Sequence, residues 1–177
     1  MTLRKARMSD IPGILRLING YAAQGLMLPR NGFELAENIR DFTVAAAADT
    51  VHGCAALHFY GPAMAEVRSL AVDETLKGAG IGRLLMEALE AEARGFDLDL
   101  LFAFTYVPKF FTRLGYRQVD RSALPLKAWK DCLRCPKFQA CDEIAVLKWL
   151  KPEAELAGRT ETADTDELIQ IPVFRGN

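Results

Sequence analysis

The most constraining feature of this sequence is a set of three alternating glycines directly before a long amphipathic pattern, KGAGIGRLLMEALEAEARGF. Apolar residues recur there at helical spacing, which makes this the clearest helix in the chain: Ile81, Leu84, Leu85, Ala88, Leu89 and Ala93. A helix that starts at Gly78, Gly80 and Gly82 presents unpaired N–H groups and the positive end of its dipole, and both attract phosphate. Glycine lets the phosphate oxygens approach the backbone. The pattern predicts an anion site, with a plain strand-to-helix turn as the alternative.

Two familiar nucleotide loops do not match this stretch. A Walker loop needs Lys-Ser or Lys-Thr after its last glycine, whereas Gly82 is followed by Arg83 and Leu84. A dinucleotide fingerprint has the spacing G-x-G-x-x-G after an early parallel strand, whereas this chain has G-x-G-x-G after strands that resemble hairpins. The spacing therefore argues against both kinds of site.

The remaining patterns predict one domain over residues 1–150 that mixes strands and helices. Strands are expected at 3–7, 42–48, 53–60, 64–72, 97–106, 116–119 and 143–150, and helices at 9–25, 32–42, 73–96 and 108–115. The segment at 42–48 is rich in alanine and could be misread as a helix, so its assignment as a strand rests on its context. Residues 151–177 have six acidic against three basic side chains. We expect them to form an acidic tail that is flexible or docks its last apolar residues, LIQIPVF, on this subunit or a partner.

Composition narrows the classes of function. The net charge is -1 over 177 residues, whereas proteins that bind polyanions usually have a basic surface and a high pI, so we expect no nucleic-acid partner. No stretch approaches the roughly 18 apolar residues of a membrane span, and we expect a soluble, cytoplasmic protein with no membrane partner. In a reducing compartment the four cysteines are expected as thiols, metal ligands or redox groups rather than as a disulfide framework.

The segment VRSLAVDETLKGAGIGRLLMEALEAEA resembles the acetyl-CoA-binding segment of the Gcn5-related N-acetyltransferases, the GNAT superfamily. Lys77 stands where that family usually has Gln or Arg. The order of elements up to residue 150 also resembles the GNAT fold: α/β, with a mixed, mostly antiparallel sheet of about seven strands, splayed at strands 4 and 5, and about four flanking helices. The resemblance implies acetyl-CoA as co-substrate. It assigns cofactor binding to Leu70, Ala71, Val72, Lys77, Gly78, Ala79, Gly80, Ile81, Gly82 and Arg83.

Acetyl transfer to an amine needs a neutral amine, a stabilised oxyanion and a proton for the departing thiolate. Glu66 is the candidate base, acting through a water, because it lies on the strand before the glycine loop. The alternative is that Glu66 pairs with Arg68, which shares its face of the strand two residues on. Arg68 could instead hold a substrate carboxylate.

The acid that many GNAT enzymes use is a tyrosine four residues before the glycine that ends the short helix. Phe111 occupies that place here, ahead of Gly115. Tyr106 is the substitute candidate, with a packing role as the alternative. A thiolate with a pKa of about 8.5 could also leave unaided, so an acid is not required.

A closer resemblance links GLMLPR (25–30), EVRSLAV (66–72) and LPLKAWKDCLRCPKFQACDEIAV (124–146) to the short, single-domain N-acetylglutamate synthases, which acetylate L-glutamate at the start of arginine biosynthesis. These segments flank the acceptor site in the GNAT fold. Two carboxylates call for cations, and the candidates are Arg30, Arg68, Lys127 and Lys130. The alternative for each of the four is that its side chain simply lies on the surface in contact with water, as most lysines and arginines do.

Other functions stay open at this stage. Acidic residues near the acceptor would suit a polyamine or a protein amine, and Asp131, Asp142 and Glu143 are available for that role. A non-catalytic acetyl-CoA-binding protein would keep the glycine loop without acetyl transfer. A zinc-stabilised nucleic-acid module would use CLRCPKF as a knuckle, but a second pair of ligands is missing. A structural zinc at Cys132, Cys135 and Cys141 is a separate possibility, but tetrahedral zinc wants four ligands, so the fold would have to bring a fourth one near. We therefore favour reduced thiols and predict no metal; a homodimer is left open.

Overall fold

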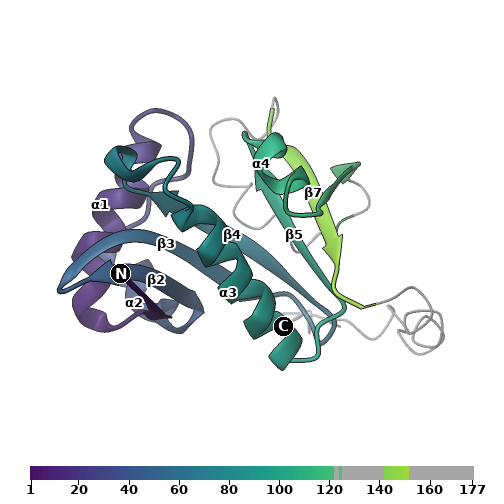
Figure 1. The fold of residues 1–177 in the computed structure, drawn as a ribbon, viewed down its shortest axis with the longest axis horizontal. Helices are drawn as coiled ribbons and strands as arrows, with labels where there is room; N and C mark the ends of the chain where they lie inside the picture. Colours follow the sequence, from purple (N-terminus) through teal and green to yellow (C-terminus); the bar gives the residue numbers. More distant parts are fainter. Residues whose placement is uncertain (122–123, 125–141, 152–177) are drawn as a thin grey trace, which may run out of the picture.

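The computed structural model describes residues 1–121, 124 and 142–151 (Figure 1). Its strands form one seven-stranded sheet in the order β1-β2-β3-β4-β5-β7-β6. The strands are β1 (Thr2–Lys5), β2 (Phe42–Ala47), β3 (Thr50–Phe59), β4 (Met64–Val72), β5 (Leu100–Thr105), β6 (Arg117–Val119) and β7 (Ile144–Trp149). The β4–β5 pair is parallel and the other neighbouring pairs are antiparallel. The predicted mixed, mostly antiparallel sheet is confirmed.

Helices cover both faces of the sheet. They are α1 (Ile11–Ala22), α2 (Gly32–Glu37), α3 (Ile81–Gly95) and α4 (Pro108–Thr112), with single 3-10 turns at Met8–Asp10, Ile39–Asp41 and Glu74–Leu76. Strand β3 is packed closely on both sides: a Cβ on Gly13 of α1 would lie 2.9 Å from Val51, and one on Gly53 would lie 2.9 Å from Ile81 of α3. Glycine at these two positions thus allows the helices to approach the strand.

The sheet opens where β4 leaves β5. Within the described residues, these strands pair only at Met64–Leu100, Ala65–Leu101 and Glu66–Phe102, and Figure 1 shows them diverging beyond that point. On its other side β4 stays paired with β3, but with a bulge: Cys54 pairs with Ala71 and Ala56 with Arg68. The predicted splay between strands 4 and 5 is confirmed.

The bulge is centred on Ser69, whose φ of 51° lies in the left-handed region. That conformation is uncommon for a non-glycine residue and is typical of a bulge. The thiol of Cys54, fully buried on β3, donates to the Ser69 carbonyl over 3.6 Å. Burial raises the pKa of this thiol to about 12, so it stays protonated and can donate.

Most element boundaries agree with the predictions to within a few residues, and the strand at 64–72 and the alanine-rich strand agree closely. All four expected helices are shorter than predicted, and for two of them the cause is local. The 32–42 helix ends at Glu37 and is followed by a 3-10 turn, because Asn38 leaves the helical region at φ -108° and ψ 16°. The 73–96 helix starts only at Ile81, because Gly78 and Gly80 both have positive φ.

The expected turn at 49–52 is tighter than its sequence suggested, since β3 begins at Thr50 and Ala48 adopts a φ of 49°. Among the described residues, no helix is both long and apolar enough to cross a membrane. The domain boundary at residue 150 stays a prediction, because residues 152–177 lie outside the described part of the chain.

Candidate active site

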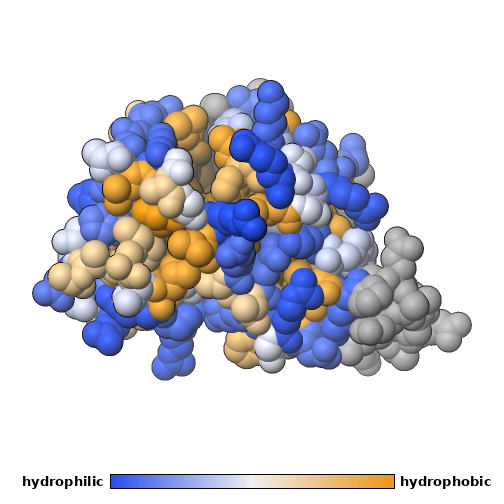
Figure 2. All heavy atoms as spheres, viewed as in Figure 1, coloured by the Kyte–Doolittle hydropathy of each residue, from blue (hydrophilic) through white to orange (hydrophobic). Residues whose placement is uncertain are grey.

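The N-terminus of α3 forms the candidate cofactor loop. Gly80 caps the helix in the left-handed conformation, and the first N–H groups of an α-helix have no partner within the helix. A Cβ on Gly82 would lie 3.4 Å from the ring of Phe110 on α4, an ordinary contact distance, so α4 packs directly beside the loop. In Figure 2 the surface is hollowed between the start of α3 and α4, with apolar residues in view there. This arrangement suits an anionic group at the helix end with an apolar arm beside it.

Two exposed cations border the loop. The ammonium of Lys77 lies 4.9 Å from the centre of the Tyr21 ring and 3.6 Å from Glu74, and contact with Tyr21 is the main cause that raises the pKa of Lys77. The guanidinium of Arg83 bonds Glu87 over 2.7 Å, which raises the pKa of Arg83. Both groups are positively charged at neutral pH, and they flank the helix start in the chain: Lys77 precedes Gly78, and Arg83 lies in the first turn of α3.

The second half of β4 supplies backbone groups. Ala71 and Val72 pair with β3, and the edge that faces β5 is open beyond Glu66 within the described residues. The hydroxyl of Tyr21 donates to the Val72 carbonyl over 2.6 Å, which ties the end of α1 to this strand. Leu70 is partly buried against the α3 side of the core. The residues assigned to the cofactor thus lie on two adjoining elements, β4 and the start of α3.

A small cleft lies on the α1–α2 face of the sheet, next to the bulge. It encloses about 320 Å³, its open mouth included, and is lined by Arg30, Glu34, Leu35, Asn38, Asp41, Phe42, Ala56, Arg68 and Ser69. Two of the four predicted acceptor cations, Arg30 and Arg68, are therefore brought together. Lys127 and Lys130, the other two, lie outside the described residues.

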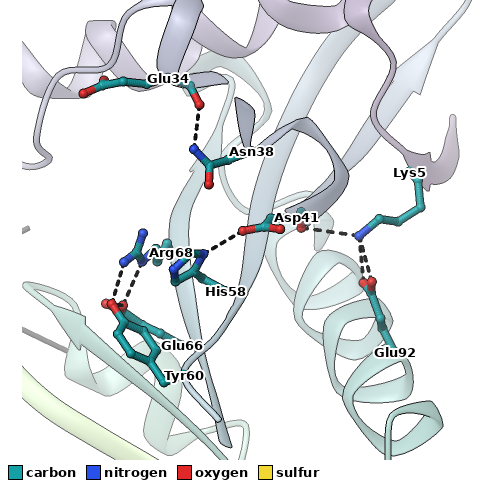
Figure 3. Close-up of polar contacts among 9 residues, drawn as sticks. All are labelled: Lys5, Glu34, Asn38, Asp41, His58, Tyr60, Glu66, Arg68 and Glu92. Carbon is teal, nitrogen blue, oxygen red and sulfur yellow. Dashed lines mark hydrogen bonds and ion pairs between the residues drawn. The ribbon is translucent and has the colours of Figure 1, made fainter. Parts of the chain in front are cut away.

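Side-chain amides hold the α1–α2 loop in place beside this cleft. Asn19 donates to the Arg30 carbonyl and accepts from the Arg30 N–H, each over 3.0 Å. Asn31 and Glu34 form a capping box at the start of α2. Asn38 donates to the Glu34 carbonyl over 2.8 Å (Figure 3). Sequence reasoning missed Asn19, although a helix-disfavouring amide at the end of α1 signals a contact with the next loop.

Glu66 is buried, with 8% of its surface exposed, and it pairs with Arg68 as their shared face predicts. The Nε of Arg68 donates to Oε2 of Glu66 over 2.8 Å. Tyr60, which follows β3, joins the pair: its hydroxyl donates to the same oxygen over 3.0 Å and accepts from Nη2 of Arg68 over 2.5 Å (Figure 3). Sequence reasoning missed Tyr60. His58 pairs with Glu66 across the strands, so Tyr60, two residues on, was its diagonal neighbour.

A second polar pair, His58 and Asp41, lies next to Tyr60. Nδ1 of His58 is 2.7 Å from Oδ2 of Asp41, and the His58 ring packs edge-on against Tyr60 with centroids 5.2 Å apart. Asp41 lines the cleft, so polar side chains extend from its wall to Glu66 (Figure 3).

The two aromatic residues considered for the acid role have different surroundings. The Tyr106 hydroxyl donates to Oδ1 of Asp142 over 2.8 Å, which ties the end of β5 to the residues before β7. Phe111 is 3% exposed and packs edge-on against Tyr116, so it belongs to the core. A tyrosine at position 111 would therefore need a different local packing to reach the splayed strands.

The three candidate zinc ligands are Cys132, Cys135 and Cys141. They lie within residues 125–141, which the structure does not describe. Within the described residues, no group of three potential ligands is close enough to hold a metal ion. The acidic candidates Asp142 and Glu143 lie just before β7, and Asp131 is outside the described part.

Comparison with known proteins agrees with this geometry. The model of the GNAT acetyltransferase domain matches residues 38–118. The chain is 45% identical over 148 residues to an uncharacterized N-acetyltransferase of Chlorobaculum tepidum, an alignment that covers 84% of this chain and 96% of that protein. It is 31% identical over 153 residues to the amino-acid acetyltransferase of Mycobacterium tuberculosis, covering 85% and 87% of the two chains.

Solved structures show the same fold. A Mycobacterium tuberculosis protein in complex with CoA and NLQ superposes with a TM-score of 0.73 at 28% identity and covers 85% of this chain and 100% of its own. The N-acetylglutamate synthase of Neisseria gonorrhoeae, complexed with coenzyme A and N-acetyl-glutamate, gives a TM-score of 0.77 at 27% identity. The match covers 85% of this chain but 35% of that enzyme. With the splayed strands and the glycine loop already in place, these relationships show that the chain belongs to the GNAT acetyltransferase family, as an acyltransferase whose co-substrate is acetyl-CoA.

Proposed function

We propose that this enzyme transfers the acetyl group of acetyl-CoA to the α-amine of L-glutamate, the reaction that opens arginine biosynthesis. The observation that favours this acceptor is the cleft beside the β4 bulge, which brings Arg30 and Arg68 together next to the buried carboxylate of Glu66. Guanidinium groups suit the planar carboxylates of an amino acid. The relative named amino-acid acetyltransferase and the synthase structure support the same class of acceptor.

In this proposal the cofactor binds across β4 and the start of α3. The N–H groups at Ile81, Gly82 and Arg83, with Lys77 nearby, meet the phosphates of acetyl-CoA. Backbone groups of Leu70 to Val72 hold the pantetheine arm along the open edge of β4 and polarise the thioester carbonyl. The thioester then lies between the diverging strands, within reach of the acceptor cleft.

Glu66 removes a proton from the α-ammonium group of glutamate, through a water molecule. The neutral nitrogen attacks the thioester carbon, so a C–N bond forms and the C–S bond breaks through a tetrahedral intermediate. As the intermediate collapses, its nitrogen loses a second proton to solvent, and the thiolate of CoA leaves and takes one proton, either from Tyr106, which solvent then reprotonates, or directly from solvent. Glu66 returns its own proton to solvent. Each turnover therefore releases one proton, one CoA and one N-acetylated product.

The decisive experiment is an initial-rate screen of amino acids and polyamines with acetyl-CoA, followed by release of free CoA. Glutamate should give the highest kcat/KM. Turnover with another amine and none with glutamate would overturn the acceptor and leave the acetyltransferase chemistry intact. Binding of acetyl-CoA without turnover of any amine would favour a non-catalytic binding protein.

Charge-removing variants test which residues hold the acceptor. Arg30→Ala and Arg68→Ala should raise the KM for glutamate by about tenfold or more, because each loses a charged hydrogen bond, and the KM for acetyl-CoA should stay within about twofold. Lys127→Ala and Lys130→Ala test the remaining two assignments. The matched control is Arg117→Ala, which removes an exposed cation on β6, a strand outside the proposed site.

A further inference from the structure

Tyr60 is held in place from several sides. Its backbone N–H donates to the Met64 carbonyl over 3.1 Å, at the closed end of the β3–β4 hairpin. Its ring lies 5.2 Å from the ring of His58 and 5.6 Å from that of Phe102, measured between centroids. The guanidinium carbon of Arg68 lies 5.5 Å above the same ring. Aromatic contacts and the cation–π contact together fix the direction of the hydroxyl.

That hydroxyl joins the carboxylate of Glu66 to the guanidinium of Arg68, which lines the cleft. It has one proton, which goes to Oε2 of Glu66, and its lone pairs accept Nη2 of Arg68. Arg68 also donates from Nε to Oε2 of Glu66, so the three side chains close a ring of hydrogen bonds. Burial, with the neighbouring Glu66 carboxylate second, raises the pKa of the Tyr60 phenol, and the group therefore stays a donor throughout the neutral range.

We propose that Tyr60 is a positioning residue for acetyl transfer, which fixes the carboxylate of Glu66 and the guanidinium of Arg68 in one arrangement. The proposal rests on the proposed role of Glu66 as the base. A carboxylate that is held by two donors on one oxygen cannot rotate freely, so its reach toward the amine is the same in every turnover. Arg68 is held by the same hydroxyl, so the base and the acceptor-binding cation keep a constant separation.

The test is Tyr60→Phe, which removes the hydroxyl and keeps the ring with its packing. We expect kcat with glutamate to fall about tenfold, in line with loss of one hydrogen bond to a charged group, while the KM for acetyl-CoA stays within about twofold. Tyr116→Phe is the matched control. It removes a buried phenol hydroxyl from the α3 side of the sheet, away from the cleft, and should leave kcat unchanged.

A double-mutant cycle separates positioning from a general structural effect. If Tyr60 acts through Glu66, then Tyr60→Phe should change kcat by less than about twofold in a Glu66→Gln background. The proposal is overturned if Tyr60→Phe alone matches the wild type, or if the same loss appears in both backgrounds. A wild-type rate in Glu66→Gln would instead overturn the base assigned in the proposed function. The screen of acceptors tests the identity of the substrate independently of both.

If Tyr60→Phe lowers the unfolding midpoint by several degrees, Phe102→Leu provides the second measurement. That change loosens the packing against the Tyr60 ring and leaves all three polar groups in the chain. A loss of kcat in Phe102→Leu that disappears in the Tyr60→Phe background supports positioning through the hydroxyl. Additive losses would refute it.

Discussion

Two pairs of an arginine and a carboxylate in this protein have the same chemistry and different surroundings. Arg4 binds Asp10 with both ends of its guanidinium, over 2.7 and 2.9 Å, and the Arg7 N–H donates to the same carboxylate over 2.7 Å. Arg68 contacts Glu66 from Nε alone among the contacts described above, and shares it with Tyr60. The first pair ties β1 to the start of α1, and the second lies beside the cleft, which Arg68 lines.

The different surroundings of these two pairs indicate which feature of a buried ion pair points to function. Asp10 is 5% exposed and accepts from three donors, as a structural carboxylate does. Glu66 is 8% exposed, but it lies where the paired part of β4 and β5 ends and the cofactor strand opens. A charged group placed at an opening in the sheet has a different use from one that closes a helix end. The geometry around each pair therefore matters more than the residue types.

The largest effect is expected from Glu66→Gln, which keeps the size of the side chain and removes the proposed base. We expect kcat with glutamate to fall by about 100-fold or more, while acetyl-CoA binding is unchanged. Steady-state rates of CoA release and isothermal titration with CoA measure the two quantities. Asp10→Asn is the matched change at the structural pair and should keep the wild-type kcat. Equal kcat values for the two variants would contradict the distinction between the pairs.

The next effect is expected from Arg68→Lys. Lysine offers a point charge on a flexible stem and cannot reach both Glu66 and Tyr60 in the fixed geometry of a guanidinium. We expect kcat/KM for glutamate to fall about tenfold, which corresponds to about 1.4 kcal/mol. Arg4→Lys is the control and should affect unfolding alone. A kcat/KM near that of the wild type would mean that the charge of Arg68 suffices.

The glycine turn before α3 was predictable because its signals are local. The glycines at 78, 80 and 82 are adjacent in sequence, and positive φ at Gly78 and Gly80 accounts for them. Alternation along EVRSLAV likewise placed Glu66 and Arg68 on one face, and the structure pairs them. The splay between β4 and β5 followed from the resemblance, because nothing in the two strand sequences states where their pairing ends.

The surroundings of the cleft were predicted less completely, because the contacts there join residues from separate elements. Asn19 holds Arg30 from eleven residues away, and His58 meets Asp41 from seventeen. Periodicity assigns residues to faces of elements but does not say which loop packs on which helix. The roles of Lys127 and Lys130, the state of the three cysteines, the cytoplasmic location and the homodimer all stay predictions.

A smaller effect is expected on stability from Asp10→Asn. The amide cannot accept the same charged contacts from Arg4, and we expect the free energy of unfolding to fall by about 1 kcal/mol, since Arg4 is partly open to solvent. Urea unfolding at neutral pH, followed by circular dichroism, measures it. Glu66→Gln is the comparison and should change stability less than kcat. If Asp10→Asn lowers the free energy of unfolding without changing kcat, and Glu66→Gln lowers kcat with little change in stability, the two pairs have separate roles.

The smallest effect is the dependence of this stability difference on pH. Hydrogen bonding from Arg4 lowers the pKa of Asp10 below its ordinary value, so the carboxylate stabilises the folded state when it is ionised. The contribution is fully present above the unfolded-state pKa of about 3.9 and is lost as the pH falls through the lower folded-state value. The difference in unfolding free energy between the wild type and Asp10→Asn should therefore be constant from pH 7 to about pH 5 and shrink below about pH 4. Urea midpoints at half-unit steps of pH test this. A difference that stays constant down to about pH 2 would mean that Asp10 acts through packing and neutral hydrogen bonds, and the structural pair would then owe nothing to its charge.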